Sequence, residues 1–239
     1  MTFRPYPALT AVCAVLLAFL IGLGVWQLQR LQWKLGLIAE VTRNMAAPPI
    51  SLDAALALGH AAEYRHVALT GRFDNARESY AYGIDRDAVP DYHVIVPFMT
   101  DDHRTLMVDR GIVPVGKRDP ATRSEGQIEG ETRVTGVWRT PDAPGAFTPA
   151  RDPAHRIWYT RDATLIAASD HISLASPVLI EADATPNPGG LPKGGQTQVE
   201  FRNEHLQYAI TWFLMAAGLF GVYLAYHVSK GRLALTMKD

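Results

Sequence analysis

The sequence contains very little cysteine. Its 239 residues include one cysteine, Cys13, which lies inside an apolar run. No disulfide can therefore form within the chain, and the absence of a CxxC pair argues against a thiol oxidoreductase, a thiolate copper chaperone and c-type haem attachment. A folded domain in this protein must depend on its hydrophobic core.

An excess of charge of either sign is also missing. The chain has 23 Lys and Arg residues against 24 Asp and Glu residues, and it has no basic block, so nucleic-acid binding is not expected. The catalytic signatures HExxH, GxSxG and the Walker loop are absent as well. We therefore expect that the protein is not an enzyme.

Two long stretches lack Asp, Glu, Lys and Arg altogether. They are residues 8–26 and 206–228, and each is long enough for a helix to cross a hydrocarbon layer of about 30 Å. The alternative for the first stretch is a cleaved signal peptide, with Arg4 as a short positive region. An uncleaved anchor is favoured, because the stretch is longer than usual for such a peptide and no A-x-A site follows it.

Both apolar stretches carry small residues four positions apart. This spacing places them on one helix face and lets helices approach closely in lipid. We predict that these faces pack on each other or on a partner, although Ala and Gly are also simply common in membrane helices. The faces comprise Ala14, Ala18 and Gly22 in the first stretch and Ala217, Gly221 and Ala225 in the second.

Charges beside the second stretch favour a cytoplasmic C-terminus, since Lys230, Arg232 and Lys238 follow it. The charges beside the first stretch conflict with this orientation, but a long domain can be translocated largely regardless of charge. The predicted segments are a cytoplasmic N-terminus (1–7), a transmembrane helix (8–28), a helical extension (29–47), an extracytoplasmic β-rich domain (48–204), a second transmembrane helix (205–228) and a cytoplasmic tail (229–239).

The sequence between the two apolar stretches predicts a mostly antiparallel β domain. Pro48 and Pro49 end the preceding helix, Ser51 is a suitable cap for a short helix over 51–58, and a second short helix is expected from Asp162. The predicted fold class is a membrane protein of the α+β type, with a mostly antiparallel β domain that could close into a small barrel. Seven strands are predicted, at 64–73, 78–84, 92–99, 104–111, 132–139, 156–160 and 177–182.

Two short polar motifs lie at predicted strand ends. Asp101, Asp102 and His103 could bind a metal ion, but a solvated turn between two strands is favoured. Asp109, Arg110 and Gly111 are expected to end a strand, with an ion pair between Asp109 and Arg110 and a turn at Gly111.

The stretch before the second span offers the best candidate site. Asn203 can cap the helix, and His205, Tyr208 and Trp212 share one face at helical spacing. A neutral imidazole beside aromatic rings could ligate haem iron, so we predict His205 as the metal ligand and Tyr208 and Trp212 as cofactor-binding residues. The alternative is an interfacial histidine bonded to headgroups or to the domain. His227 is about 33 Å further along the helix and cannot share an iron with His205.

The chain resembles the Surfeit locus protein one family, the assembly factors of haem-copper cytochrome c oxidase. The likeness rests on blocks spread over nearly the whole length, of which the block containing NEHLQYAITWF is the most specific. Ile112 departs from the DRGW that the family pattern often has. The blocks are residues 24–38, 63–73, 92–98, 108–118 and 203–213.

The resemblance implies a two-span protein of a bacterial plasma membrane with a periplasmic domain; a mitochondrial inner membrane is the less favoured location. It implies an assembly factor that binds haem a or assists its insertion into oxidase subunit I, and His205 corresponds to the family histidine proposed as haem ligand. The implied partners are subunit I, haem a synthase and membrane lipid. The alternative function is a scaffold that stabilises oxidase intermediates without holding haem.

Overall fold

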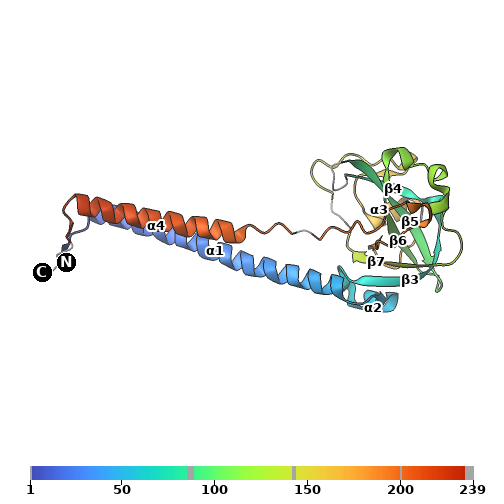
Figure 1. The fold of residues 1–239 in the computed structure, drawn as a ribbon, viewed down its shortest axis with the longest axis horizontal. Helices are drawn as coiled ribbons and strands as arrows, with labels where there is room; N and C mark the ends of the chain where they lie inside the picture. Colours follow the sequence, from blue (N-terminus) through green and yellow to red (C-terminus); the bar gives the residue numbers. More distant parts are fainter. Residues whose placement is uncertain (1, 85–88, 142–143, 200, 235–239) are drawn as a thin grey trace. The chain divides into compact units, whose positions relative to one another are not determined.

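The computed structural model describes residues 2–84, 89–141, 144–199 and 201–234. The chain divides into two compact units. One is formed by the two ends of the chain, Met1–Glu40 and Glu200–Asp239, and the other by Val41–Val199 (Figure 1).

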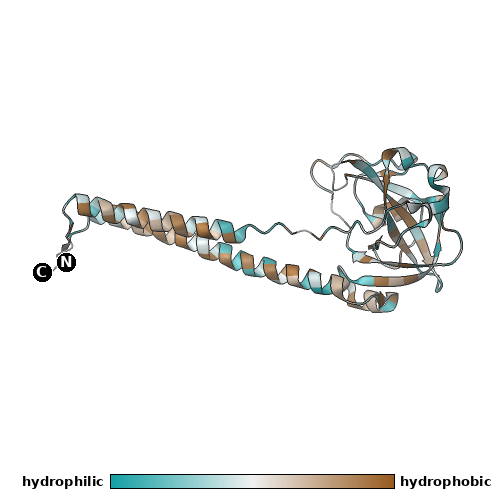
Figure 2. Cartoon of the chain, viewed as in Figure 1, coloured by the Kyte–Doolittle hydropathy of each residue, from teal (hydrophilic) through white to brown (hydrophobic). Residues whose placement is uncertain are grey.

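The first unit is built from two antiparallel helices. Helix α1 spans Pro7–Ala46 and ends before Pro48 and Pro49, and helix α4 spans His205–Ser229. Both are long and apolar enough to cross a membrane, as predicted, and Figure 2 shows the apolar residues along them. Near one end of the pair, the Thr10 and Tyr223 hydroxyl oxygens lie 2.8 Å apart.

The contact between the helices follows a spacing of three and four residues. This is the 3.5-residue period of a coiled-coil seam. Gly24 lies in the seam, where a Cβ atom would be 2.6 Å from the Phe213 ring. The wholly or partly buried positions that follow this spacing are Thr10, Cys13, Leu17, Leu20, Gly24, Gln27 and Leu31 in α1 and His205, Ala209, Trp212, Ala216, Leu219, Tyr223 and His227 in α4.

The predicted small-residue faces do not form this contact. The two helices do pack on each other, as predicted. They do so through other residues, because residues at a strict spacing of four drift away from a seam whose period is 3.5. Packing of these faces on a partner stays a prediction. The exposed small residues are Ala14, Ala18, Gly22, Ala217, Gly221 and Ala225.

The second unit is a five-stranded barrel with additional strands at its edge. The barrel order is β3-β7-β9-β6-β5, and β5 pairs back onto β3 to close it. Within the barrel, β6 and β9 are parallel and all other neighbours are antiparallel, which confirms the mostly antiparallel barrel. The strands are β2 (Ile50–Ser51), β3 (His66–Phe73), β4 (Ser79–Ile84), β5 (Pro90–Thr100), β6 (Thr105–Pro114), β7 (Thr132–Arg139), β8 (Ile157–Trp158) and β9 (Leu179–Ala182).

Two short α-helices begin after polar cap residues, of which the sequence predicts the one at Ser51. The Ser51 hydroxyl accepts a hydrogen bond from the Ala54 N–H at the start of α2 (Leu52–Leu58). The Asp162 carboxylate accepts two backbone hydrogen bonds at the start of α3 (Ala163–Ser169). Short 3₁₀ segments cover Gly59–Ala62, Asn75–Arg77, Val115–Lys117, Pro120–Gly126, Pro153–His155 and Pro188–Gly190.

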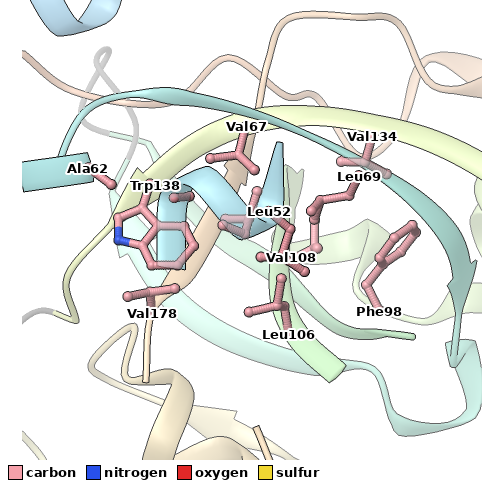
Figure 3. Close-up of a cluster of buried hydrophobic side chains, with 12 residues drawn as sticks. Leu52, Ala62, Val67, Leu69, Phe98, Leu106, Val108, Val134, Trp138 and Val178 are labelled. Atoms are coloured by element: carbon pink, nitrogen blue, oxygen red, sulfur yellow. The ribbon is translucent and has the colours of Figure 1, made fainter. Parts of the chain in front are cut away.

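Strand alternation divides the core into two main clusters. Leu106 and Val108 point into a cluster to which all five barrel strands and α2 contribute, so it fills the barrel (Figure 3). Met107, between them, points to the opposite face, where it packs with Trp158 and Ile166 of α3. Both faces of this part of β6 are therefore buried, which explains the apolar run from Leu106 to Val108.

Candidate functional site

Helix α4 begins at His205. The cap residue is Glu204, which makes no side-chain capping hydrogen bond, so the predicted cap at Asn203 is wrong by one residue. The first backbone N–H groups of a helix carry partial positive charge, and Glu204 still places a carboxylate there. His205 thus lies at the first turn of an apolar helix, partly exposed.

The His205 ring is oriented by α1. Its Nδ1 donates to the Gln27 Oε1 at 2.8 Å, across the pair of helices. An imidazole that uses Nδ1–H in this way keeps Nε2 available as a lone-pair donor, which is how second partners orient a metal-binding histidine. Gln27 is not among the predicted site residues, although it lies in one of the blocks that carry the family resemblance.

The two predicted aromatic neighbours differ in exposure. Tyr208 is 51% exposed and lies next to His205 on the surface of α4. Trp212 is partly buried in the helix seam. A flat ligand beside His205 would contact the exposed Tyr208 ring before it contacts Trp212. Trp212 shares the helix face of His205 and also packs in the seam between the two helices.

His227, which the sequence analysis treated as a residue separate from the iron site, is fully buried at the other end of α4. Its Nδ1 donates to the Tyr223 carbonyl oxygen at 2.9 Å, and its Nε2 accepts from the Tyr6 N–H at 3.4 Å. Phe3 and Tyr226 also pack against the ring. Strands β1 (Thr2–Phe3) and β10 (Leu233–Ala234) pair beside it. With both ring nitrogens occupied, His227 is a structural residue.

The β domain contains a second notable histidine. His93 of β5 donates through Nδ1 to Asp109 Oδ2 of β6 at 2.7 Å, and its side chain is 15% exposed. Asp109 also accepts the Gly111 N–H at 2.9 Å and lies 3.6 Å from Arg161, which pairs with Glu181 at 2.6 Å. Sequence reasoning could not rank His93 above the other domain histidines, because its partner is distant in the chain.

The pKa values of this pair move in opposite directions. Burial alone would lower the pKa of His93, but the charge and hydrogen bond of Asp109 outweigh burial and raise it. Burial alone would raise the pKa of Asp109, but His93, Arg161 and the Gly111 N–H together lower it. Both shifts favour the imidazolium form of His93 and the carboxylate form of Asp109.

Neither polar motif forms the structure of a metal site. Asp101, Asp102 and His103 form an exposed turn between β5 and β6, as predicted, in which Asp102 pairs with Arg104. Within the described part of the chain, no three His, Cys, Asp or Glu side chains gather in a way that could hold a metal ion.

The predicted strand end at Asp109, Arg110 and Gly111 is wrong. Strand β6 continues to Pro114, and its pairing with β5 shifts register at this point, so the motif is a bulge within the strand. Asp109 and Arg110 do not pair, because adjacent strand residues point to opposite faces. Asp109 turns to His93, and Arg110 turns to the Gly126 carbonyl and Asn187.

Known proteins and a family pattern match most of the chain. The SURF1 family pattern matches residues 14–217, which include both His205 and the β domain. The chain is 36% identical to Surfeit locus protein 1 of Takifugu rubripes over 87% of this chain and 92% of that protein. It is 39% identical to the Mus musculus protein of that name, over 82% and 68%, and 38% identical to the Homo sapiens one, over 82% and 70%.

Proposed function

Because this chain belongs to the SURF1 family, we propose that it is a membrane-anchored assembly factor for haem-copper cytochrome c oxidase and not an enzyme. Two apolar helices, one near each end of the chain, flank one folded β domain. This architecture suits a protein that holds a cargo or a partner.

The proposed cargo is haem a, with His205 as iron ligand. The observation that carries this proposal is the hydrogen bond from His205 Nδ1 to Gln27 Oε1, because it leaves Nε2 as the ring nitrogen for a metal. The half-exposed Tyr208 ring supplies an apolar surface beside it. The residues present therefore fit a haem ligand, and Gln27 would hold the imidazole in the tautomer that ligation needs.

The proposed location is a bacterial plasma membrane, with the β domain on the periplasmic side. Lys230 and Arg232, which follow α4, support a cytoplasmic C-terminus. Under this topology His205 is at the periplasmic boundary of the membrane. The proposed partners are haem a synthase, from which the cargo would come, subunit I, which would receive it, and the surrounding membrane lipid.

Haem occupancy tests the proposal directly. The full chain is co-expressed with the enzymes that make haem a, purified in detergent, and examined by absorption spectroscopy and haem extraction. Wild-type protein should carry haem a, and His205→Ala should lose most of it. Gln27→Leu should retain haem but bind it roughly 10- to 100-fold more weakly, because the ligand ring is no longer held.

His60→Ala is the matched control, because His60 is an exposed histidine of the β domain. It should leave haem occupancy unchanged. If His205→Ala retains the wild-type haem content while His60→Ala behaves normally, His205 is not the ligand.

A scaffold without haem is the second candidate function. It is favoured by the exposed small-residue face of α4, because the seam with α1 leaves Ala217, Gly221 and Ala225 uncovered. A photo-crosslinker at Gly221 should then capture subunit I or another assembly factor. Colourless protein with specific capture would favour the scaffold; failure to capture either class would count against it.

A further inference from the structure

Helix α1 carries an exposed arginine close to the level of His205, and the proposed role of His205 does not use it. Arg30 is the first charged residue of α1 after the apolar stretch that ends at residue 26. It follows Gln27, the partner of the His205 ring, by three residues, which places it about 4.5 Å further along the helix axis. Helix α1 continues past this level, whereas α4 begins there (Figure 1).

Arg30 and Tyr208 lie on the same side of the helix pair. Tyr208 follows His205 by three residues in α4, and Arg30 follows Gln27 by the same number in α1. Since the His205 and Gln27 side chains are in contact, each of the other two residues is rotated from that contact by about 60° in the same sense. The helices are antiparallel and are related by a twofold axis perpendicular to the pair, so equal rotations lead to the same side.

The two sides of the helix pair differ in composition at this level. Trp26 and Trp33 are rotated from the contact in the same sense as Arg30, and both rings are about half-exposed. On the opposite side, Leu28 and Leu206 are exposed aliphatic residues. The side that carries Arg30 is therefore the aromatic one.

The Arg30 guanidinium forms no ion pair with an acidic side chain of the described residues. It lies 4.5 Å from the centre of the Trp33 ring. Glu204, the carboxylate at the start of α4, already pairs with Arg202 at 2.6 Å. An exposed guanidinium held over a ring keeps N–H groups available, in a fork that matches the two oxygens of a carboxylate.

This side of the pair matches a ligand with an apolar body and one acidic edge. The Tyr208 and Trp26 rings offer an apolar surface beside His205, and the uncharged stretch of α1 continues from Trp26 back to residue 8. Arg30 supplies the positive charge at the polar end of that surface. A haem has this distribution, because its propionates lie together on one edge of the ring.

We propose that Arg30 binds a propionate of the haem whose iron His205 would ligate. This inference rests on the haem function proposed above and assigns a second contact to the same site. Arg30 would orient the acidic edge away from the apolar stretch and favour porphyrins that carry free acids. A lipid phosphate offers Arg30 similar chemistry, and the experiment separates it from the propionate.

The test compares two iron porphyrins that differ only in the charge of the propionates. They are iron protoporphyrin IX and its dimethyl ester, titrated into the full chain in phosphatidylcholine nanodiscs, with empty nanodiscs subtracted. Soret absorption reports both the affinity and the iron ligand. Wild-type protein should bind the acid roughly 3- to 10-fold more tightly than the ester, with the same Soret position for both.

Arg30→Gln should weaken binding of the acid to the level of the ester, and leave the ester affinity and the Soret position unchanged. Arg43→Gln is the matched control, because Arg43 is an exposed arginine about 20 Å further along the same helix. It should keep the preference for the acid. His205→Ala should change the Soret position and weaken the acid and the ester alike, since both depend on the iron ligand.

The outcomes separate this proposal from the haem function. Equal wild-type affinities for acid and ester, or an Arg30→Gln variant that still prefers the acid, would overturn the role of Arg30 and leave His205 as the ligand. Equal loss of both affinities in Arg30→Gln would also overturn it, and would indicate that Arg30 positions the helix against lipid phosphates. No saturable binding to wild-type protein would contradict the haem function and this proposal together.

Discussion

His93 and Asp109 meet across a β-bulge, with Nδ1 and Oδ2 2.7 Å apart and side chains 15% and 3% exposed. They are not direct partners in the sheet, since His93 is opposite Ile112 and Asp109 is opposite Ile95. The one extra residue of the bulge, on β6, turns the two side chains toward each other. A charged pair thus stabilises the one irregular point between β5 and β6.

This pair should make stability depend on pH. The raised pKa of His93 contributes stability that is complete below its ordinary value of 6.5 and is lost as pH rises through the folded value. The lowered pKa of Asp109 contributes stability that is present above its ordinary value of 3.8 and is lost as pH falls through the folded value. The pair is therefore most stabilising between these two limits.

His93→Gln should lower the free energy of unfolding by about 1–3 kcal/mol at pH 6, because the buried Asp109 loses its charged partner. The difference from wild type should shrink as pH rises to 9. Urea unfolding of the full chain in detergent at several pH values measures it, with the exposed His60→Gln as control. A difference that stays constant over this range would show that the imidazolium is not what stabilises the site.

Gly24→Leu should weaken the pairing of α1 and α4. A Cβ at this position already lies 2.6 Å from the Phe213 ring, so a larger side chain forces the helices apart, at a cost of about 1–3 kcal/mol. Gly22→Leu is the matched control, because nothing lies within 4 Å of a Cβ there. Thermal unfolding in detergent should show a lower Tm for the first variant alone; equal Tm values would argue against the seam.

Gly111→Ala should destabilise the β domain by at least about 2 kcal/mol. Gly111 has φ +109°, a value that side chains disfavour, and its Cβ would overlap the Lys193 backbone carbonyl. The strain would also disturb the hydrogen bond from Ile112 N to Lys193 O, at 3.0 Å. Urea unfolding measures the loss against Gly116→Ala, whose Cβ meets no atom within 4 Å; comparable stability of the two variants would contradict the clash.

Elements specified by local sequence could be predicted, and the structure confirms them. The two apolar helices, the cap at Ser51, the short helix after Asp162 and the approximate positions of the seven strands all depend on neighbouring residues. The predictions were wrong where one local sequence pattern is compatible with two different structures. Gly111 allows a bulge as readily as a turn, and small residues at a spacing of four need not face the nearest helix.

The sequence by itself determined the composition of the membrane helices, the β character of the domain and the position of His205 at the start of α4. Only the folded chain shows which side chains meet: Gln27 with His205, Asp109 with His93, and Arg110 with Asn187. Each of these contacts joins separate elements of the chain. Helix and strand periodicity set the face of each residue, but only the packing of one element on another chooses its partner.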